Sequence, residues 1–158
     1  MAKLAPGLKP RPGSRGETTP ALLLATAASY ASAAEAADEK KSQNHIPALY
    51  LLSAFSIELS LKAFILSQTG DAKELSDIGH DLSKAWKRAR SLGLDVSTSI
   101  IPLSDFDWLI EAVAPHHKAM TFRYMPNVQT FTSKAAPPDM MKGAGALCAI
   151  VARSVQIS

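Results

Sequence analysis

Two charged side chains interrupt the most apolar part of the sequence. Glu58 and Lys62 are four residues apart within a run, 46–66, in which nearly all other residues are apolar or small. On a helix this spacing places both side chains on one face with the acid first, the better order for an ion pair. We expect a partly buried ion pair that could also reach His80 or Arg123.

His80 and Asp81 follow Gly79 at the start of another helical pattern. A side chain such as Asp81 can cap a helix by accepting hydrogen bonds from the free N–H groups of its first turn. Cleavage of RNA needs a base for the 2′-hydroxyl proton and a cation for the developing phosphorane charge, and His80 with Arg123 could supply them near neutral pH. A capping role and an exposed ligand-binding role for His80 and Asp81 both remain open.

Arg123 and Tyr124 lie in a segment, 116–126, that holds more aromatic and ionisable side chains than an inert loop needs. A guanidinium forms strong paired hydrogen bonds with carboxylates and with phosphates. Arg123 therefore suits either a structural tie to a carboxylate such as Glu58 or recognition of an anion.

Metal ions and cofactors are not expected. His116 and His117 follow Pro115 and are predicted to be exposed loop residues; adjacent histidines do not easily bind one ion, and no carboxylate cluster accompanies them. The single cysteine, Cys148, excludes an internal disulfide and a cysteine-based metal cluster. The chain also lacks a glycine-rich phosphate loop and a serine-centred nucleophile motif, so nucleotide binding would have to use side chains.

Apolar periodicity and capping residues predict helices along most of the chain. Thr19 and Pro20 form a good helix start, and Gly70 and Gly93 are expected to end later helices. Segment 71–79 is expected to be a polar connection. The expected helices cover 20–39, 46–69, 81–92, 104–114 and 138–155. Because no run is long enough to build a sheet, the predicted fold is an all-α, four- to five-helix up-and-down bundle.

Length and composition fit one globular domain of 158 residues, with 47% hydrophobic and 20% charged residues. Residues 1–18 are rich in proline, glycine and basic side chains and are expected to be a flexible tail, which leaves 19–158 as the helical domain. The net charge of +3 permits nucleic acid as a partner without requiring it. The basic side chains between residues 84 and 90 either form a solvated face or contact a phosphate backbone.

The expected location is the cytoplasm, where a lone cysteine stays reduced. The N-terminus imitates a secretory signal, but Glu17 and Pro20 interrupt the approach to its short apolar part. No membrane-spanning segment is expected, because Glu58 and Lys62 lie near the middle of the most apolar stretch, where charge is costly in lipid.

Three motifs together resemble the HEPN domain family. They are Glu58-Leu59-Ser60-Leu61-Lys62-Ala63, Gly79-His80-Asp81-Leu82, and Phe122-Arg123-Tyr124 shortly before a proline. The resemblance covers roughly 20–155. It implies a four- to five-helix up-and-down bundle, usually a symmetric homodimer, that is associated with nucleotide or RNA. Several branches of the family are metal-independent endoribonucleases of toxin–antitoxin or antiphage systems.

The chain departs from the catalytic members of that family. Those members share an Arg followed a few residues later by a His, and no Arg here has a His at that spacing. The main hypothesis is therefore a non-catalytic module that binds nucleotide or RNA, or interacts with a partner. Its site would be lined by Glu58, Lys62, His80, Asp81, Arg123 and Tyr124. Two alternatives stay open: an endoribonuclease with a displaced His80 and Arg123 pair, and a structural bundle recruited to a nucleotidyltransferase.

Overall fold

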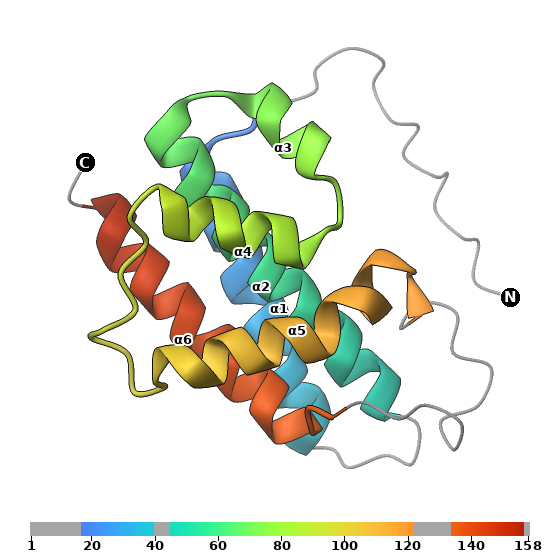
Figure 1. The fold of residues 1–158 in the computed structure, drawn as a ribbon. Coiled ribbons are helices and arrows are strands. Elements are labelled where there is room, and N and C mark those ends of the chain that lie inside the picture. Colours follow the sequence, from blue (N-terminus) through green and yellow to red (C-terminus); the bar gives the residue numbers. More distant parts are fainter. Residues whose placement is uncertain (1–16, 40–44, 122–133, 157–158) are drawn as a thin grey trace, which may run out of the picture.

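The computed structural model describes residues 17–39, 45–121 and 134–156, which contain six helices and no strand (Figure 1). The helices are α1 (Pro20–Glu39), α2 (His45–Thr69), α3 (Ala72–Ile78), α4 (Leu82–Ser91), α5 (Leu103–Lys118) and α6 (Pro137–Gln156). The all-α bundle expected from the sequence is confirmed. The expected tail lies almost wholly outside the described residues.

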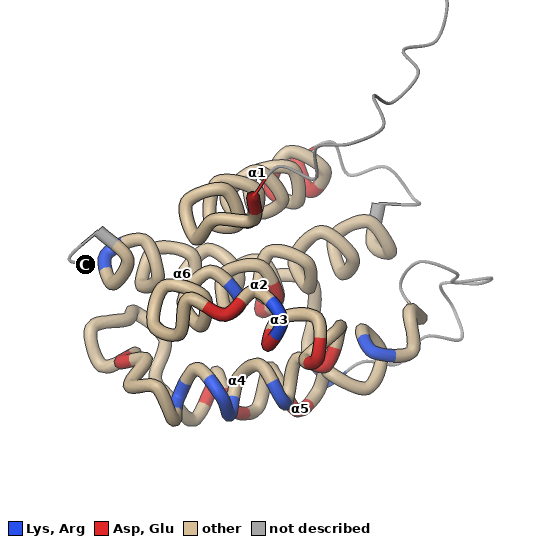
Figure 2. The backbone as a smooth tube through the Cα atoms, turned by 90° about the horizontal axis from the view of Figure 1, so that it is seen from above, with Lys and Arg blue, Asp and Glu red and all other residues tan. Residues whose placement is uncertain are grey.

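Helix α2 is the centre of the bundle and contacts each of the other five described helices. It runs antiparallel to α1, and α6 packs beside both (Figure 1). Seen from above, α1 lies on one side of α2 and α6, and α4 and α5 lie on the other (Figure 2). A helix with neighbours on several sides needs apolar residues around most of its circumference, which explains the long apolar run in this part of the sequence.

The small serines of α2 lie inside the bundle. Ser53, Ser56 and Ser60 are all fully buried. Their spacing of three and four residues forms one narrow stripe, and small side chains let neighbouring backbones approach closely. The stripe therefore allows neighbouring helices to pack closely against α2.

By length and mean hydropathy alone, the segment Ile46–Thr69 is apolar enough to cross a membrane, in contrast to the expectation from the sequence. Within the fold, however, 72% of its most apolar window is buried. The core helix of a soluble protein passes the same test. Its two charged residues, Glu58 and Lys62, are also paired with each other. The packing is therefore consistent with a soluble bundle.

The bundle has one helix more than the sequence predicts, because 71–79 is not simply a polar link. It forms the short helix α3, capped by Asp71, whose side chain accepts hydrogen bonds from the backbone N–H groups of Lys73 and Glu74. Leu75 and Ile78 are buried on one face. A helix of seven residues is unstable alone, so this cap and this burial are what stabilise it.

The expected end of the fourth helix at Pro115 is wrong. Helix α5 continues through Pro115 to Lys118, so His116 and His117 are helical rather than loop residues. His117 is only 1% exposed. Its position continues the buried face of α5 beyond the proline, and packing of this face against the bundle offsets the cost of a proline inside the helix.

Candidate functional site

Glu58 is the hub of a polar cluster inside the bundle. Its carboxylate belongs to α2 and the residue is only 3% exposed. Oε1 accepts a hydrogen bond from Lys62 Nζ at 2.7 Å. Oε2 lies 3.0 Å from His80 Nδ1 and 2.5 Å from His117 Nε2. The expected Glu58–Lys62 ion pair is confirmed, and of the two further partners considered for it, His80 is in contact with Glu58, while Arg123 lies outside the described residues.

The cluster keeps the Glu58 carboxylate ionised. Burial on its own raises the pKa of this group, but hydrogen bonds from His117, Lys62 and His80 outweigh the burial, and the pKa falls from 4.5 to about 2. An ionised carboxylate can only accept hydrogen bonds, so the two ring nitrogens that face it carry protons. For a neutral His80 this places the proton on Nδ1 and leaves Nε2 as the acceptor.

His80 forms the open edge of the cluster. Its side chain is 43% exposed, whereas the side chains of Glu58, Lys62 and His117 are 4%, 12% and 1% exposed. It follows Gly79, whose positive φ of 59° turns the chain between α3 and α4. The turn places Nδ1 of the imidazole against Glu58, and the side chain stays partly exposed.

A second link, closer to the surface, joins the start of α4 to the end of α5. Asp81 caps α4 by accepting a hydrogen bond from the backbone N–H of Lys84, and its other oxygen accepts one from Lys118 Nζ at 2.8 Å. Asp81 follows His80, and Lys118 follows His117. The start of α4 and the end of α5 are therefore joined twice, through Glu58 inside and through the Asp81–Lys118 ion pair outside.

Phe55 orients both imidazoles from the apolar side. Its ring meets His117 edge-on with centroids 5.0 Å apart, and meets His80 in the same way at 6.1 Å. The two histidine rings are themselves nearly perpendicular, at 5.9 Å. On the far side, Tyr30 of α1 packs against Phe55. These contacts restrict the rotation of both imidazoles.

The predicted site is assembled in part. Glu58, Lys62 and His80 come together, while Asp81 turns to Lys118. Arg123 and Tyr124 lie outside the described residues, so their predicted roles stay predictions. Sequence reasoning missed His117 because Pro115 suggested a loop. The signal that could have found it is the spacing of Phe106, Ile110, Val113 and His117, which marks one buried face of α5.

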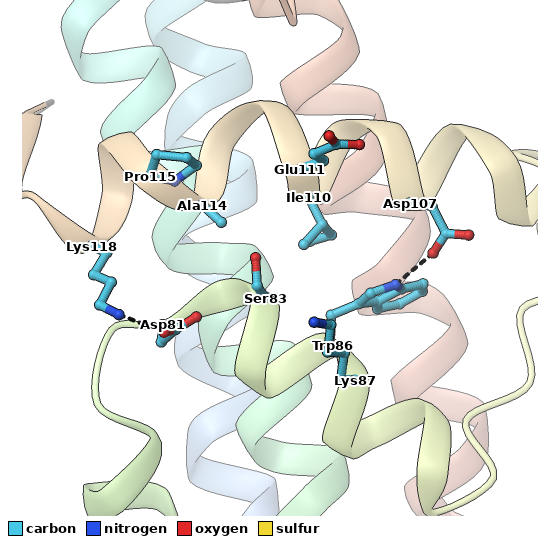
Figure 3. Close-up of a pocket in the computed structure, with 10 residues that line it drawn as sticks. All are labelled: Asp81, Ser83, Trp86, Lys87, Asp107, Ile110, Glu111, Ala114, Pro115 and Lys118. Carbon is cyan, nitrogen blue, oxygen red and sulfur yellow. Dashed lines mark hydrogen bonds and ion pairs between the residues drawn. The ribbon is translucent and has the colours of Figure 1, made fainter.

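A separate groove of about 540 Å³ lies between α4 and α5 (Figure 3). The Asp81–Lys118 pair closes one end, and the Trp86 indole donates a hydrogen bond to Asp107 at the other end. Glu58, His80 and His117 are not among the residues that line it. The groove and the Glu58 cluster are therefore neighbouring but distinct features.

Comparison with protein-family models, with curated proteins and with solved structures finds no match to this chain. The resemblance carried by the sequence motifs therefore stays a prediction. What the site can do has to follow from its side chains. These supply a partly exposed histidine oriented by a carboxylate, and three potential ligand atoms, on Glu58, His80 and His117, that lie within 4.8 Å of one another.

Proposed function

We propose that this chain is a helical binding domain of the HEPN type, which holds RNA or a nucleotide through a phosphate group at His80. The observation that carries the proposal is the half-open position of His80, whose Nδ1 faces Glu58 and whose side chain is 43% exposed. A protonated His80 would present Nε2–H to a phosphate oxygen, while the Glu58 carboxylate would stabilise the imidazolium from behind.

The charge of the neighbouring surface supports a phosphate ligand. Lys84 and Lys87 are exposed on α4, and Lys118 is exposed at the end of α5. Figure 2 shows basic residues gathered along α4. Such side chains attract a polyanion and strengthen its binding at low ionic strength.

The arginines of the described chain favour binding over catalysis. Arg88 pairs with Glu74, and Arg90 donates to the Leu94 carbonyl and lies over the Trp86 ring. Arg153, near the end of α6, donates to Thr98. Among the described residues no guanidinium is paired with the Glu58 cluster, so an arginine that stabilises the charge developed in RNA cleavage would have to come from outside them.

One observation supports an endoribonuclease as a second candidate. A carboxylate hydrogen-bonded to one nitrogen of an imidazole leaves the other nitrogen able to accept a proton, which is the arrangement of a general base. Glu58 and His80 have this arrangement. In this candidate, Arg123 supplies the cation that stabilises the phosphorane.

The test measures RNA binding and cleavage together in buffer with EDTA. Fluorescence anisotropy with a labelled single-stranded RNA pool compares the wild type with His80→Ala, Arg123→Ala and the control His116→Ala. His80→Ala loses a charged hydrogen bond to the phosphate, so its affinity for RNA should be about tenfold or more below that of the wild type. The affinity of the control should equal that of the wild type. Gels of the same samples report cleavage.

Each outcome points to one function. Weaker binding by His80→Ala without cleavage supports the binding domain. Cleavage by the wild type that disappears in both His80→Ala and Arg123→Ala supports the endoribonuclease. Equal binding by a folded His80→Ala variant, with no cleavage by any version, contradicts both and favours recruitment to a protein partner such as a nucleotidyltransferase.

A further inference from the structure

We infer that Glu58, His80 and His117 form a binding site for one divalent transition-metal ion, with Zn²⁺ as the reference ion. Each residue offers one ligand atom, and the three atoms lie within 4.8 Å of one another. The ligands come from α2, from the turn before α4 and from α5. His80 and His117 are 22 and 59 residues from Glu58 in sequence, so the set exists only in the folded chain.

The donor atoms determine the class of ion. Two imidazole nitrogens and one carboxylate oxygen are ligands that suit Zn²⁺ and similar first-row ions. Mg²⁺ and Ca²⁺ prefer oxygen atoms throughout and fit this set poorly. Three protein ligands also leave a coordination position for water or a small ligand.

The geometry needs only a small adjustment to accept the ion. His80 Nδ1 and His117 Nε2 both face the same carboxylate oxygen, at 3.0 and 2.5 Å. Around a tetrahedral ion with bonds near 2.0–2.2 Å, ligand atoms lie about 3.3 Å apart. Each imidazole would therefore withdraw from Oε2 by less than about 1 Å and carry its ring proton on the opposite nitrogen. The two ring nitrogens, which lie within 4.8 Å of each other, would also have to reach this spacing.

The surroundings already orient the ligands. Lys62 binds Oε1, so Glu58 is set to ligate the ion through Oε2 alone. The edge of Phe55 fixes the planes of both imidazoles. Such supporting contacts tune a metal site. The Lys62 ammonium also repels a cation, so we expect an exchangeable site, which the ion reaches past the exposed ring of His80.

The inference does not depend on RNA binding. An ion held by Nδ1 would leave His80 Nε2–H, the group of the proposed phosphate contact, free of the ion. Because the RNA test contains EDTA and the metal test contains no RNA, either proposal can fail while the other stands.

The test uses the full chain, without a histidine tag and stripped with EDTA. Co²⁺ titration followed by visible absorption should show one equivalent bound with d–d bands of a low-coordinate site, and Zn²⁺ should displace it. Calorimetry then gives the Zn²⁺ affinity of the wild type, His80→Ala, Glu58→Gln and the control His116→Ala. We expect affinity to fall at least about tenfold in His80→Ala and Glu58→Gln. The control should match the wild type.

His80→Ala is the decisive variant because His80 is the exposed ligand, and circular dichroism confirms that it is folded. Absence of stoichiometric Co²⁺ and Zn²⁺ binding by the folded wild type overturns the inference. Wild-type affinity in folded His80→Ala also overturns it. An equal loss in His116→Ala would show that the ion binds to surface histidines instead.

Discussion

Glu58 and Asp81 are two carboxylates that connect the same pair of helices, and they differ in depth. Glu58 is buried and accepts hydrogen bonds from three side chains, whereas the Asp81 side chain is 25% exposed and binds the exposed ammonium end of Lys118. The pKa of Glu58 is lowered although burial opposes this. The pKa of Asp81 is lowered mainly by hydrogen bonds from Lys118 and the Lys84 backbone.

The difference in burial between the two carboxylates indicates which link is needed for the stability of the fold. A buried charge that loses a partner cannot turn to water, so its partners are needed for stability. A surface ion pair exchanges easily with solvent and contributes little. We therefore expect the inner link to determine how α4 and α5 are held, and the outer link to contribute mainly charge at the surface.

Acid should remove the stabilising contribution of the ionised Glu58 carboxylate, which is the largest effect expected for the inner link. The folded-state pKa of Glu58 is lowered from 4.5 to about 2, so its contribution is complete above pH 4.5 and is lost as the pH falls towards 2. A tenfold change in proton affinity corresponds to about 1.4 kcal/mol, so the full contribution is about 3 kcal/mol.

Urea unfolding of EDTA-treated wild type and Glu58→Gln, between pH 6 and 2, measures this contribution. The amide has no charge to lose, so the difference in free energy of unfolding between the two proteins should shrink by about 3 kcal/mol over this range. A difference that stays constant with pH would contradict an ionised Glu58 stabilised by its three donors.

A matched pair of neighbouring residues compares the two links directly. His117→Leu removes a donor to a buried carboxylate and should lower the free energy of unfolding by about 2 kcal/mol. Lys118→Leu removes the outer ion pair and should cost less than about 1 kcal/mol. Chemical denaturation of both variants measures the two values.

Salt provides the control for this comparison. The small effect of Lys118→Leu should decline further at high ionic strength, because exposed charges are screened, while the effect of His117→Leu should persist. Equal costs for the two substitutions would contradict the distinction between an inner and an outer link.

The bundle and part of the site could be predicted from local sequence. Thr19 caps α1 through the N–H of Leu22, and Gly70 follows α2 with a positive φ, as expected. The Glu58–Lys62 pair also follows from the helical spacing. Capping and i,i+4 spacing are local properties, and for this reason a sequence reveals them.

The rest depends on tertiary packing. His117 reaches Glu58 only because α5 continues beyond Pro115, and a proline favours a helix end when sequence alone is considered. The convergence of two distant histidines on one oxygen has no local signal at all. The expectation about adjacent histidines concerns only His116 and His117, and it does not consider His80, whose ring lies 5.9 Å from that of His117.

The packing of α5 against α6 gives the smallest expected effect on the inner and outer links. A Cβ atom at Gly143 would lie 2.2 Å from Leu109 Cδ2, whereas one at Gly145 would meet nothing within 4 Å. Gly143→Ala should therefore force Leu109 or α5 to move and cost about 1 kcal/mol. Gly145→Ala should stabilise the helix by about 0.5–1 kcal/mol.

A displacement of α5 in Gly143→Ala should affect the inner link through Glu58 and the outer Asp81–Lys118 link differently. The His117 side chain is buried and moves with α5, whereas the long, exposed side chain of Lys118 can follow Asp81 when the helix moves. Imidazole NMR signals of His117 should therefore change in Gly143→Ala and stay unchanged in Gly145→Ala. Thermal unfolding of both variants gives the stability. An unchanged His117 signal in a destabilised Gly143→Ala would show that Leu109 alone absorbs the clash, and that the inner link does not depend on how closely α5 packs against α6.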